Sequence, residues 1–229
     1  MNPLVYEDLF FTICDYLDFK EIVKYEVLSN HHLNMIRQHR WSHPLQIDEN
    51  DLLLILIDRY TLKNLDLSFS DVTDETVKLL NCHTLNLEGT KVTDESVKLL
   101  KCHTLDLQGT NVTDESVKHL KCHTLDLSYT NVTDESVKFL KCHTLDLQGT
   151  KVTDESVKHL QCHDLNLSYT NVTDESVKHL KCQNLNLRGT NVTDESVKLL
   201  KCHSLNIFHT KVTHETVKLL QSNGVNVIG

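Results

Sequence analysis

The chain has 229 residues, 24% of them charged, and a formal net charge of −9 at pH 7. Proteins that bind nucleic acid present a basic stripe, so this acidic balance argues against a nucleic-acid partner. The apolar run at residues 52–57 is far too short to span a bilayer. The opening MNPLVYEDLF has no basic start like that of a signal peptide. We therefore expect no membrane partner and a cytoplasmic or nuclear protein.

Residues 1–40 are not repetitive, and their apolar residues recur in three groups at helical spacing. This pattern predicts a small module of three short helices. The groups are Leu9, Phe10, Ile13 and Leu17, then Ile22, Val23, Val27 and Leu28, then Leu33, Met35 and Ile36.

The order of residues in this module resembles an F-box. It has Pro3-Leu4, then EDLxxxIxxYLDxKEI over residues 7–22, and a closing Trp41, but it departs from the family at His31-His32-Leu33. The resemblance implies binding to a Skp-type adaptor of a cullin ubiquitin ligase. The residues that it assigns to this contact or its supporting core are Pro3, Leu4, Leu9, Ile13, Leu17 and Ile22. The alternative is a helical cap without a partner.

Residues 41–60 keep the register of the repeated units after them, since Leu45 and Ile47 lie twenty residues before Leu65 and Leu67. We interpret this segment as a degenerate capping repeat, which covers the exposed end of a stacked core.

Residues 61–220 consist of eight units of twenty residues without an insertion. In the unit of residues 101–120 the alternation Leu105-Asp106-Leu107 predicts a short strand with one buried face, and the other units have the same pattern. Thr113 is a good N-cap, and Asp114 and Glu115 suit the positive end of a helix dipole. Each unit is therefore expected to be a strand, a tight turn and a helix of about two turns, held by packing on the next unit.

The pattern CxxLxLxxTxV resembles the leucine-rich repeat LxxLxLxxN/CxL, with Cys in the first Leu place and Thr in the Asn/Cys place. The resemblance implies a curved α/β solenoid with parallel strands on the concave face and short helices on the convex face. The tight turns suit the glycines Gly89, Gly109, Gly149 and Gly189. Residues 221–229 continue the strand columns with Val225 and Val227, which predicts a terminal strand.

The chain has eight cysteines, namely Cys14 and one in each of seven successive units from Cys82 to Cys202. Because their side chains should point the same way into the core, we expect buried, reduced thiols.

The outward strand positions form columns in which the units differ most. The middle column carries Asp in the first unit and in the third to fifth units and Asn in the others, and exposed aromatic residues are expected nearby. We predict that a protein substrate binds this concave face through Asp66, Glu88, Asp106, Asp126, Tyr129, Asp146, Tyr169, Arg188 and Phe208. The alternative is that these polar residues only keep the face soluble, and the helix side stays open as a second binding face.

A column of histidines runs from His83 to His163 and resumes at His203. Its members should stand in parallel, whereas a metal site needs ligands that converge, so we expect no metal site there. The sequence shows no enzyme motif, and we expect neither catalysis nor a cofactor.

The pairing of an F-box with leucine-rich repeats implies a substrate-recognition adaptor of a Skp–cullin–F-box ubiquitin ligase. The near-identical units favour a recently expanded family, such as those of giant DNA viruses, in which case the protein acts in the host cytoplasm. The alternatives are a repeat scaffold without a ubiquitin link and a secreted binding protein glycosylated at sequons such as Asn111-Val112-Thr113.

Overall fold

A computed structural model describes residues 45–46, 53, 57 and 62–229. In this part of the chain ten strands form one parallel sheet, and each strand pairs with the next along the sequence. The strands are β1 (Leu45–Gln46), β2 (Asn64–Asp66), β3 (Thr84–Asn86), β4 (Thr104–Asp106), β5 (Thr124–Asp126), β6 (Thr144–Asp146), β7 (Asp164–Asn166), β8 (Asn184–Asn186), β9 (Ser204–Asn206) and β10 (Asn226–Ile228). The expected helical module at residues 1–40 and most of the capping repeat lie outside the described residues.

A short helix follows each of the strands β2 to β9. The helices are α5 (Asp74–Val77), α6 (Asp94–Val97), α7 (Asp114–Val117), α8 (Asp134–Val137), α9 (Asp154–Val157), α10 (Asp174–Val177), α11 (Asp194–Val197) and α12 (His214–Ser222). In the described part of the chain, no helix has the length and apolar character needed to cross a membrane.

The helices α5 to α11 are single turns of four residues, so the prediction of about two turns is wrong for them. After α7 the chain tightens, because the N–H groups of His119 and Leu120 bond to carbonyls three residues back, at 3.1 Å each. Such bonds close the last turn of a helix. Twenty residues per circuit leave no length for a second turn, and among the helices from α5 to α12 only α12, with nine residues, is longer.

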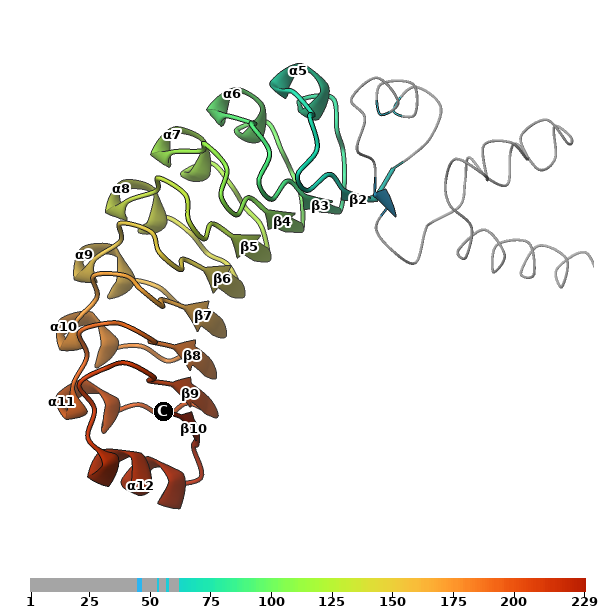
Figure 1. Cartoon of the computed structure of the whole chain (residues 1–229). Coiled ribbons are helices and arrows are strands. Elements are labelled where there is room, and N and C mark those ends of the chain that lie inside the picture. Colours follow the sequence, from blue (N-terminus) through green and yellow to red (C-terminus); the bar gives the residue numbers. More distant parts are fainter. Residues whose placement is uncertain (1–44, 47–52, 54–56, 58–61) are drawn as a thin grey trace, which may run out of the picture.

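The strands line the concave side of a curved stack and the helices line its convex side (Figure 1). From β1 to β9 neighbouring coils pair at a step of twenty residues, so Leu105 lies beside Leu125, and Leu45 lies beside Leu65 in the same way. The parallel solenoid predicted from the repeat is therefore confirmed, with its strands on the inside of the curve.

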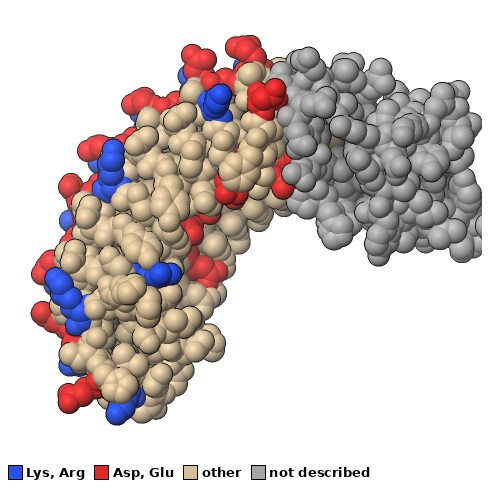
Figure 2. All heavy atoms as spheres, viewed as in Figure 1, with Lys and Arg blue, Asp and Glu red and all other residues tan. Residues whose placement is uncertain are grey.

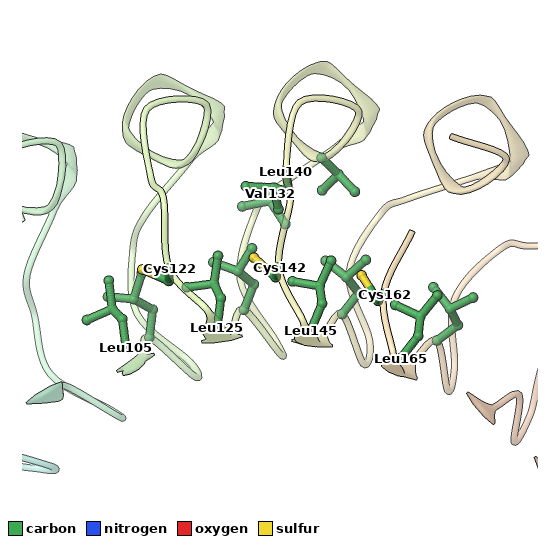
Figure 3. Close-up of a cluster of buried hydrophobic side chains, with 14 of the residues drawn as sticks. Leu105, Cys122, Leu125, Val132, Leu140, Cys142, Leu145, Cys162 and Leu165 are labelled. Carbon is green, nitrogen blue, oxygen red and sulfur yellow. The ribbon is translucent and has the colours of Figure 1, made fainter. Parts of the chain in front are cut away.

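The core is a repeated layer of apolar side chains between the strands and the helices (Figure 3). Burial of one such side chain contributes about 1.5–3 kcal/mol, which holds helices that are too short to be stable alone. One coil contributes Cys102, Leu105, Leu107, Val112, Val117 and Leu120, all buried.

The buried Thr and Ser hydroxyls of the coils from α6 to α11 are bonded within their own coil or to the preceding one. The hydroxyl of Thr110 donates to the Leu107 carbonyl at 2.7 Å. Thr113 caps α7 as predicted, because its Oγ1 accepts the N–H of Glu115 at 3.3 Å, and it also donates to Asp94 of the preceding coil. The seven cysteines from Cys82 to Cys202 are free and buried, as expected, and Cys14 lies outside the described residues.

Candidate functional site

The concave surface consists of the outward residues of the strands and of the turns that follow them (Figure 1). The register places Asp126 between Asp106 and Asp146 on neighbouring strands. All residues predicted to bind a substrate lie on a strand or directly after one: Asp66, Glu88, Asp106, Asp126, Tyr129, Asp146, Tyr169, Arg188 and Phe208. The residues predicted to bind a Skp-type adaptor lie outside the described part of the chain.

The Asp/Asn column, which is the middle column of this surface and runs from Asp66 to Asn206, also stabilises the turns, and this role was not predicted from the sequence. The Oδ1 atom of Asp106 accepts the backbone N–H of Gln108 at 2.9 Å, and Asn186 does the same for Arg188 at 3.1 Å. This bond, in which an Asp or Asn side chain closes the turn after it, recurs in all eight coils from Asp66 to Asn206. Either residue type can accept the bond, so the bond does not explain why Asp occupies some coils.

Three exposed aromatic residues stand in the turns beside this column, each in the left-handed backbone conformation. Tyr129 and Tyr169 have φ values of 56° and 57°, and Phe69 has 55°. A residue with a Cβ is strained in this region by about 1–3 kcal/mol. These positions therefore hold bulky side chains at a cost in free energy, although the side chains are exposed to between 47% at Tyr169 and 73% at Phe69.

The coil after each of these aromatic residues carries glycine at the same position, and the structure gives the reason. A Cβ on Gly149 would lie 2.9 Å from the Tyr129 ring, and one on Gly189 would lie 2.6 Å from the Tyr169 ring. Each ring therefore lies over the next turn and excludes a side chain there. We call the surface made by Phe69, Tyr129 and Tyr169, beside the Asp/Asn column, the aromatic ledge.

At the C-terminal end of the ledge, Arg188 lies between two rings. Its guanidinium carbon is 5.4 Å from the ring centres of both Tyr169 and Phe208. These are cation–π distances. The Arg188 Nε atom is buried without a hydrogen-bond partner. The side chains of Tyr169, Arg188 and Phe208, all predicted to bind a substrate, thus form one stack.

The comparisons with known proteins agree with this geometry. Residues 123–141 match a family model described as a leucine-rich repeat. A chain of the crystal structure of the mouse RP105/MD-1 complex has a similar fold, with a TM-score of 0.51 and 16% sequence identity. The likeness covers 82% of this chain and 41% of the solved one, so this chain spans about two fifths of its relative's length. No curated protein matches the sequence.

The protein folds as a leucine-rich-repeat solenoid. Thr stands where the repeat usually has Asn or Cys, and its hydroxyl bond to the Leu carbonyl three residues back recurs in every coil from Thr90 to Thr190. Thr therefore supplies one bond of each turn, as Thr110 does to Leu107, and the Asp/Asn column supplies a second, as Asp106 does to Gln108.

The concave face of the solenoid is acidic over β4 to β6, and acidic atoms show on the strand side in the upper half of Figure 2. Burial, together with the charges of Asp126, Glu88 and Asp146, raises the pKa of Asp106 to about 6, although the N–H of Gln108 opposes the shift. Burial and Asp126 also raise the pKa of Asp146, although Asn166 donates to its Oδ2 at 2.8 Å. Like charges on adjacent strands therefore oppose one another in the free protein.

Over β6 to β9 the same face becomes mostly neutral and slightly hollow. A depression of about 240 Å³ is lined there by amide and hydroxyl side chains together with two carboxylates. Its polar lining residues are Thr144, Asp146, Asp164, Asn166, Asn184, Asn186, Ser204 and Asn206. The solenoid thus offers an acidic half and an amide-lined half along one surface.

The helix side also carries exposed apolar residues, so it remains the second candidate face. Leu79, Leu99, Phe139 and Leu199 occupy one column after the helices and are more than half exposed. Glutamates nearby pair with lysines of the same coil, as in Glu115 and Lys118 at 3.0 Å. Mixed charges and separated apolar residues make this face less distinctive than the concave one.

The histidine column lies at the edge where the strands begin. The rings from His83 to His163 stack at centroid distances of 4.6–4.7 Å and are exposed. The expectation that these side chains stand in parallel is confirmed, since the interplanar angles are 6–22°.

Proposed function

We propose that the protein is a non-catalytic interaction scaffold whose concave face binds a basic segment of a protein partner. The main support for this proposal is a group of half-buried carboxylates on adjacent strands, namely Asp106, Asp126 and Asp146. Asn would close the same turns, as it does at Asn86 and Asn166. The turns therefore do not require the negative charges, whose mutual repulsion lowers the stability of the free protein. Lys or Arg of a partner would offset this repulsion.

The aromatic ledge supports the same proposal. Tyr129 and Tyr169 are exposed in a strained conformation, and rigid aromatic side chains are common anchors of protein interfaces. The solved structure with the similar fold is itself a complex of RP105 with MD-1, which agrees with a binding role for this chain.

The test is proximity labelling in cells with the full chain and two matched triple variants. Asp106→Asn, Asp126→Asn and Asp146→Asn remove three charges from the concave face. Glu115→Gln, Glu135→Gln and Glu155→Gln remove three from the helix side. Partners that bind the concave face should be lost with the first variant and retained with the second. Equal retention by both variants would contradict the proposal.

Tyr129→Gly provides a second arm of this experiment. It places at position 129 the residue that occupies positions 149 and 189, so folding should be preserved. If Tyr129 is an anchor, partner capture should fall about tenfold or more, whereas unchanged capture would remove the ledge from the interface.

A finer proposal concerns the first 40 residues and rests on their sequence alone. Their resemblance to an F-box supports a role as substrate receptor of a Skp–cullin–F-box ubiquitin ligase in the cytoplasm or nucleus, with the solenoid holding the substrate. The alternative is a scaffold without a ubiquitin link.

Binding of the full chain to a purified Skp-type adaptor tests this role. Leu17→Asp and Ile22→Asp should abolish binding, while the concave triple variant should bind normally. If the folded wild-type chain does not bind the adaptor, the scaffold proposal stands without the ubiquitin ligase.

A further inference from the structure

One coil of the histidine column differs from the others. In the column directly after the histidines, three neighbouring coils carry Thr104, Thr124 and Thr144, but the next carries Asp164. This carboxylate follows His163, whose ring stacks on His143 at 4.6 Å with an interplanar angle of 15°. A histidine pair and a carboxylate thus meet on adjacent strands at the edge of the sheet.

The three side chains lie close to one another. The Nδ1 atom of His163 is 3.0 Å from Oδ1 of Asp164, and one ligand atom from each of His143, His163 and Asp164 lies within 4.8 Å of the others. Asp164 is held in place because Thr144 Oγ1 donates to its Oδ2 at 3.2 Å and Asn184 donates to its Oδ1 at 2.5 Å. This carboxylate is therefore oriented by neighbouring strands rather than free to rotate.

We propose that His143, His163 and Asp164 form a binding site for a zinc-like divalent transition-metal ion. Imidazole and carboxylate donors bind such ions at about 2.0–2.2 Å, which places two adjacent ligand atoms about 3 Å apart. The His163 Nδ1 and Asp164 Oδ1 atoms already have this separation, so one ion can bind both. Water completes the coordination.

His143 must tilt out of the stack to reach the ion, since parallel rings direct their nitrogens side by side. Both histidines are exposed, so this rotation breaks the stacking of His143 on His123 and His163 but displaces no buried side chain. The histidines of the column alone do not converge on one point. Asp164 supplies the convergence, because it approaches from the next position of the strand.

Positive charges near the proposed site oppose metal binding, so the site depends on the carboxylate of Asp164. Lys158 and Lys181 line a neighbouring hollow of about 610 Å³ together with His143 and His163, and their charges oppose a cation. Other pairs of the column, such as His103 and His123, have Thr in place of the acid. The site should therefore bind one ion more tightly than the rest of the column, and this property is independent of the proposed function of the concave face.

Zinc titration of the full, untagged chain against a chromophoric chelator tests the proposal. The wild type should bind one zinc ion in a tight class. Asp164→Thr, which restores the residue of the neighbouring coils, and His163→Gln, which copies Gln183, should each weaken that class by about 10- to 100-fold. His103→Gln removes a histidine far from the acid and should leave the tight class unchanged.

A gain-of-site variant completes the design. Thr124→Asp places an acid after His123 and should raise the number of tight zinc ions from one to two. The proposal is overturned if the wild type binds no zinc tightly, or if Asp164→Thr binds as tightly as the wild type, which would indicate non-specific binding by the histidines. Circular dichroism of each variant must match the wild type.

Discussion

Asp94 and Thr113 belong to neighbouring coils, and the carboxylate of Asp94 accepts both hydrogen bonds that Thr113 donates. The Thr113 N–H donates to Oδ1 at 2.9 Å, and the Thr113 hydroxyl donates to Oδ2 at 2.6 Å. Ser116 of the same coil adds a third bond to Oδ1 at 2.6 Å. The arrangement recurs at each junction from Asp74 to Asp174, so a charged group joins each helix from α5 to α10 to the helix after it.

Removing one such carboxylate should destabilise the solenoid. Asp114 accepts two bonds from Thr133 and one from Ser136, and Asn in its place offers one oxygen instead of two. We expect Asp114→Asn to lower the free energy of unfolding by about 1–3 kcal/mol in urea titrations at pH 7. Glu115→Gln is the matched control. That side chain is exposed and pairs only with Lys118, so a loss of at most about 0.5 kcal/mol is expected. Equal losses would contradict the role of Asp114.

The same junctions predict a loss of stability in acid. Burial opposes ionisation of Asp94, Asp114 and their equivalents, but the bonds from Ser and Thr outweigh it, and the pKa of each of these carboxyls is lowered. A lowered pKa in the folded state gives stability that is present above the unfolded pKa of about 3.9 and lost as the pH falls through the folded value. Thermal melts should therefore show a falling Tm below about pH 4. A flat Tm from pH 5 to pH 2 would refute this prediction.

Asp106 predicts the opposite dependence, because its pKa of about 6 is raised. The folded state then binds the proton more tightly than the unfolded state, so the ionised carboxylate destabilises the fold above about pH 6 and not below about pH 4. Asp106→Asn should raise the free energy of unfolding at pH 7 by about 1 kcal/mol, less than the full pKa shift because the carboxylate is partly exposed and screened. The gain should vanish in melts at pH 4. A gain of equal size at both pH values would show that charge is not its cause.

The glycines of the turns should tolerate alanine unequally. A Cβ at Gly109 would meet nothing within 4 Å, whereas one at Gly149 would lie 2.9 Å from the Tyr129 ring, and both residues have positive φ. We expect Gly109→Ala to cost about 1 kcal/mol for the backbone alone and Gly149→Ala to cost about 1 kcal/mol more. In a Tyr129→Gly background the two costs should become equal. If the difference persists in that background, the ring contact is not its source.

The thiols of the cysteine column should be protected in the native protein. Burial raises the pKa of Cys122 to about 12 and that of Cys102 to about 11, and the thiolate is the reactive form. Treatment with iodoacetamide at pH 8 should leave the residues of this column unmodified, and all should react in guanidinium chloride. Mass spectrometry of tryptic peptides gives the result by position. Rapid native modification of any column cysteine would mean that its coil opens.

Much of the fold could be predicted from the repeat. The period of twenty residues predicted the register of the strands, the alternation at Leu105 and Leu107 predicted the buried face, and Thr113 predicted the helix start. The helix length could not be obtained in this way, because it is set by the length of the circuit rather than by helix propensity. Asp114 was interpreted as a partner of its own helix dipole, whereas its bonds run to the next coil, and contacts between coils have no local signal.

The candidate site was predictable only as a surface. The columns showed which residues share the concave face, but the turn-closing bond of Asp106 and the position of Arg188 between two rings depend on side-chain geometry. The alternation of Tyr129 with Gly149 was visible in the sequence. Its cause, a ring that lies over the next turn, became apparent only in three dimensions.

The junction between Asp94 and Thr113 also bears on how such a gene can change. Every junction from Asp74 to Asp174 uses the same residue types in the same geometry, so excision of residues 121–140 would bring Asp114 beside Thr153 with an equivalent set of partners. Unequal recombination between the near-identical units can therefore shorten or lengthen the protein by whole coils without an incompatible boundary. What changes is the succession of Asp, Asn, Tyr and Gly along the concave face, so selection can alter the recognition surface while the framework stays the same.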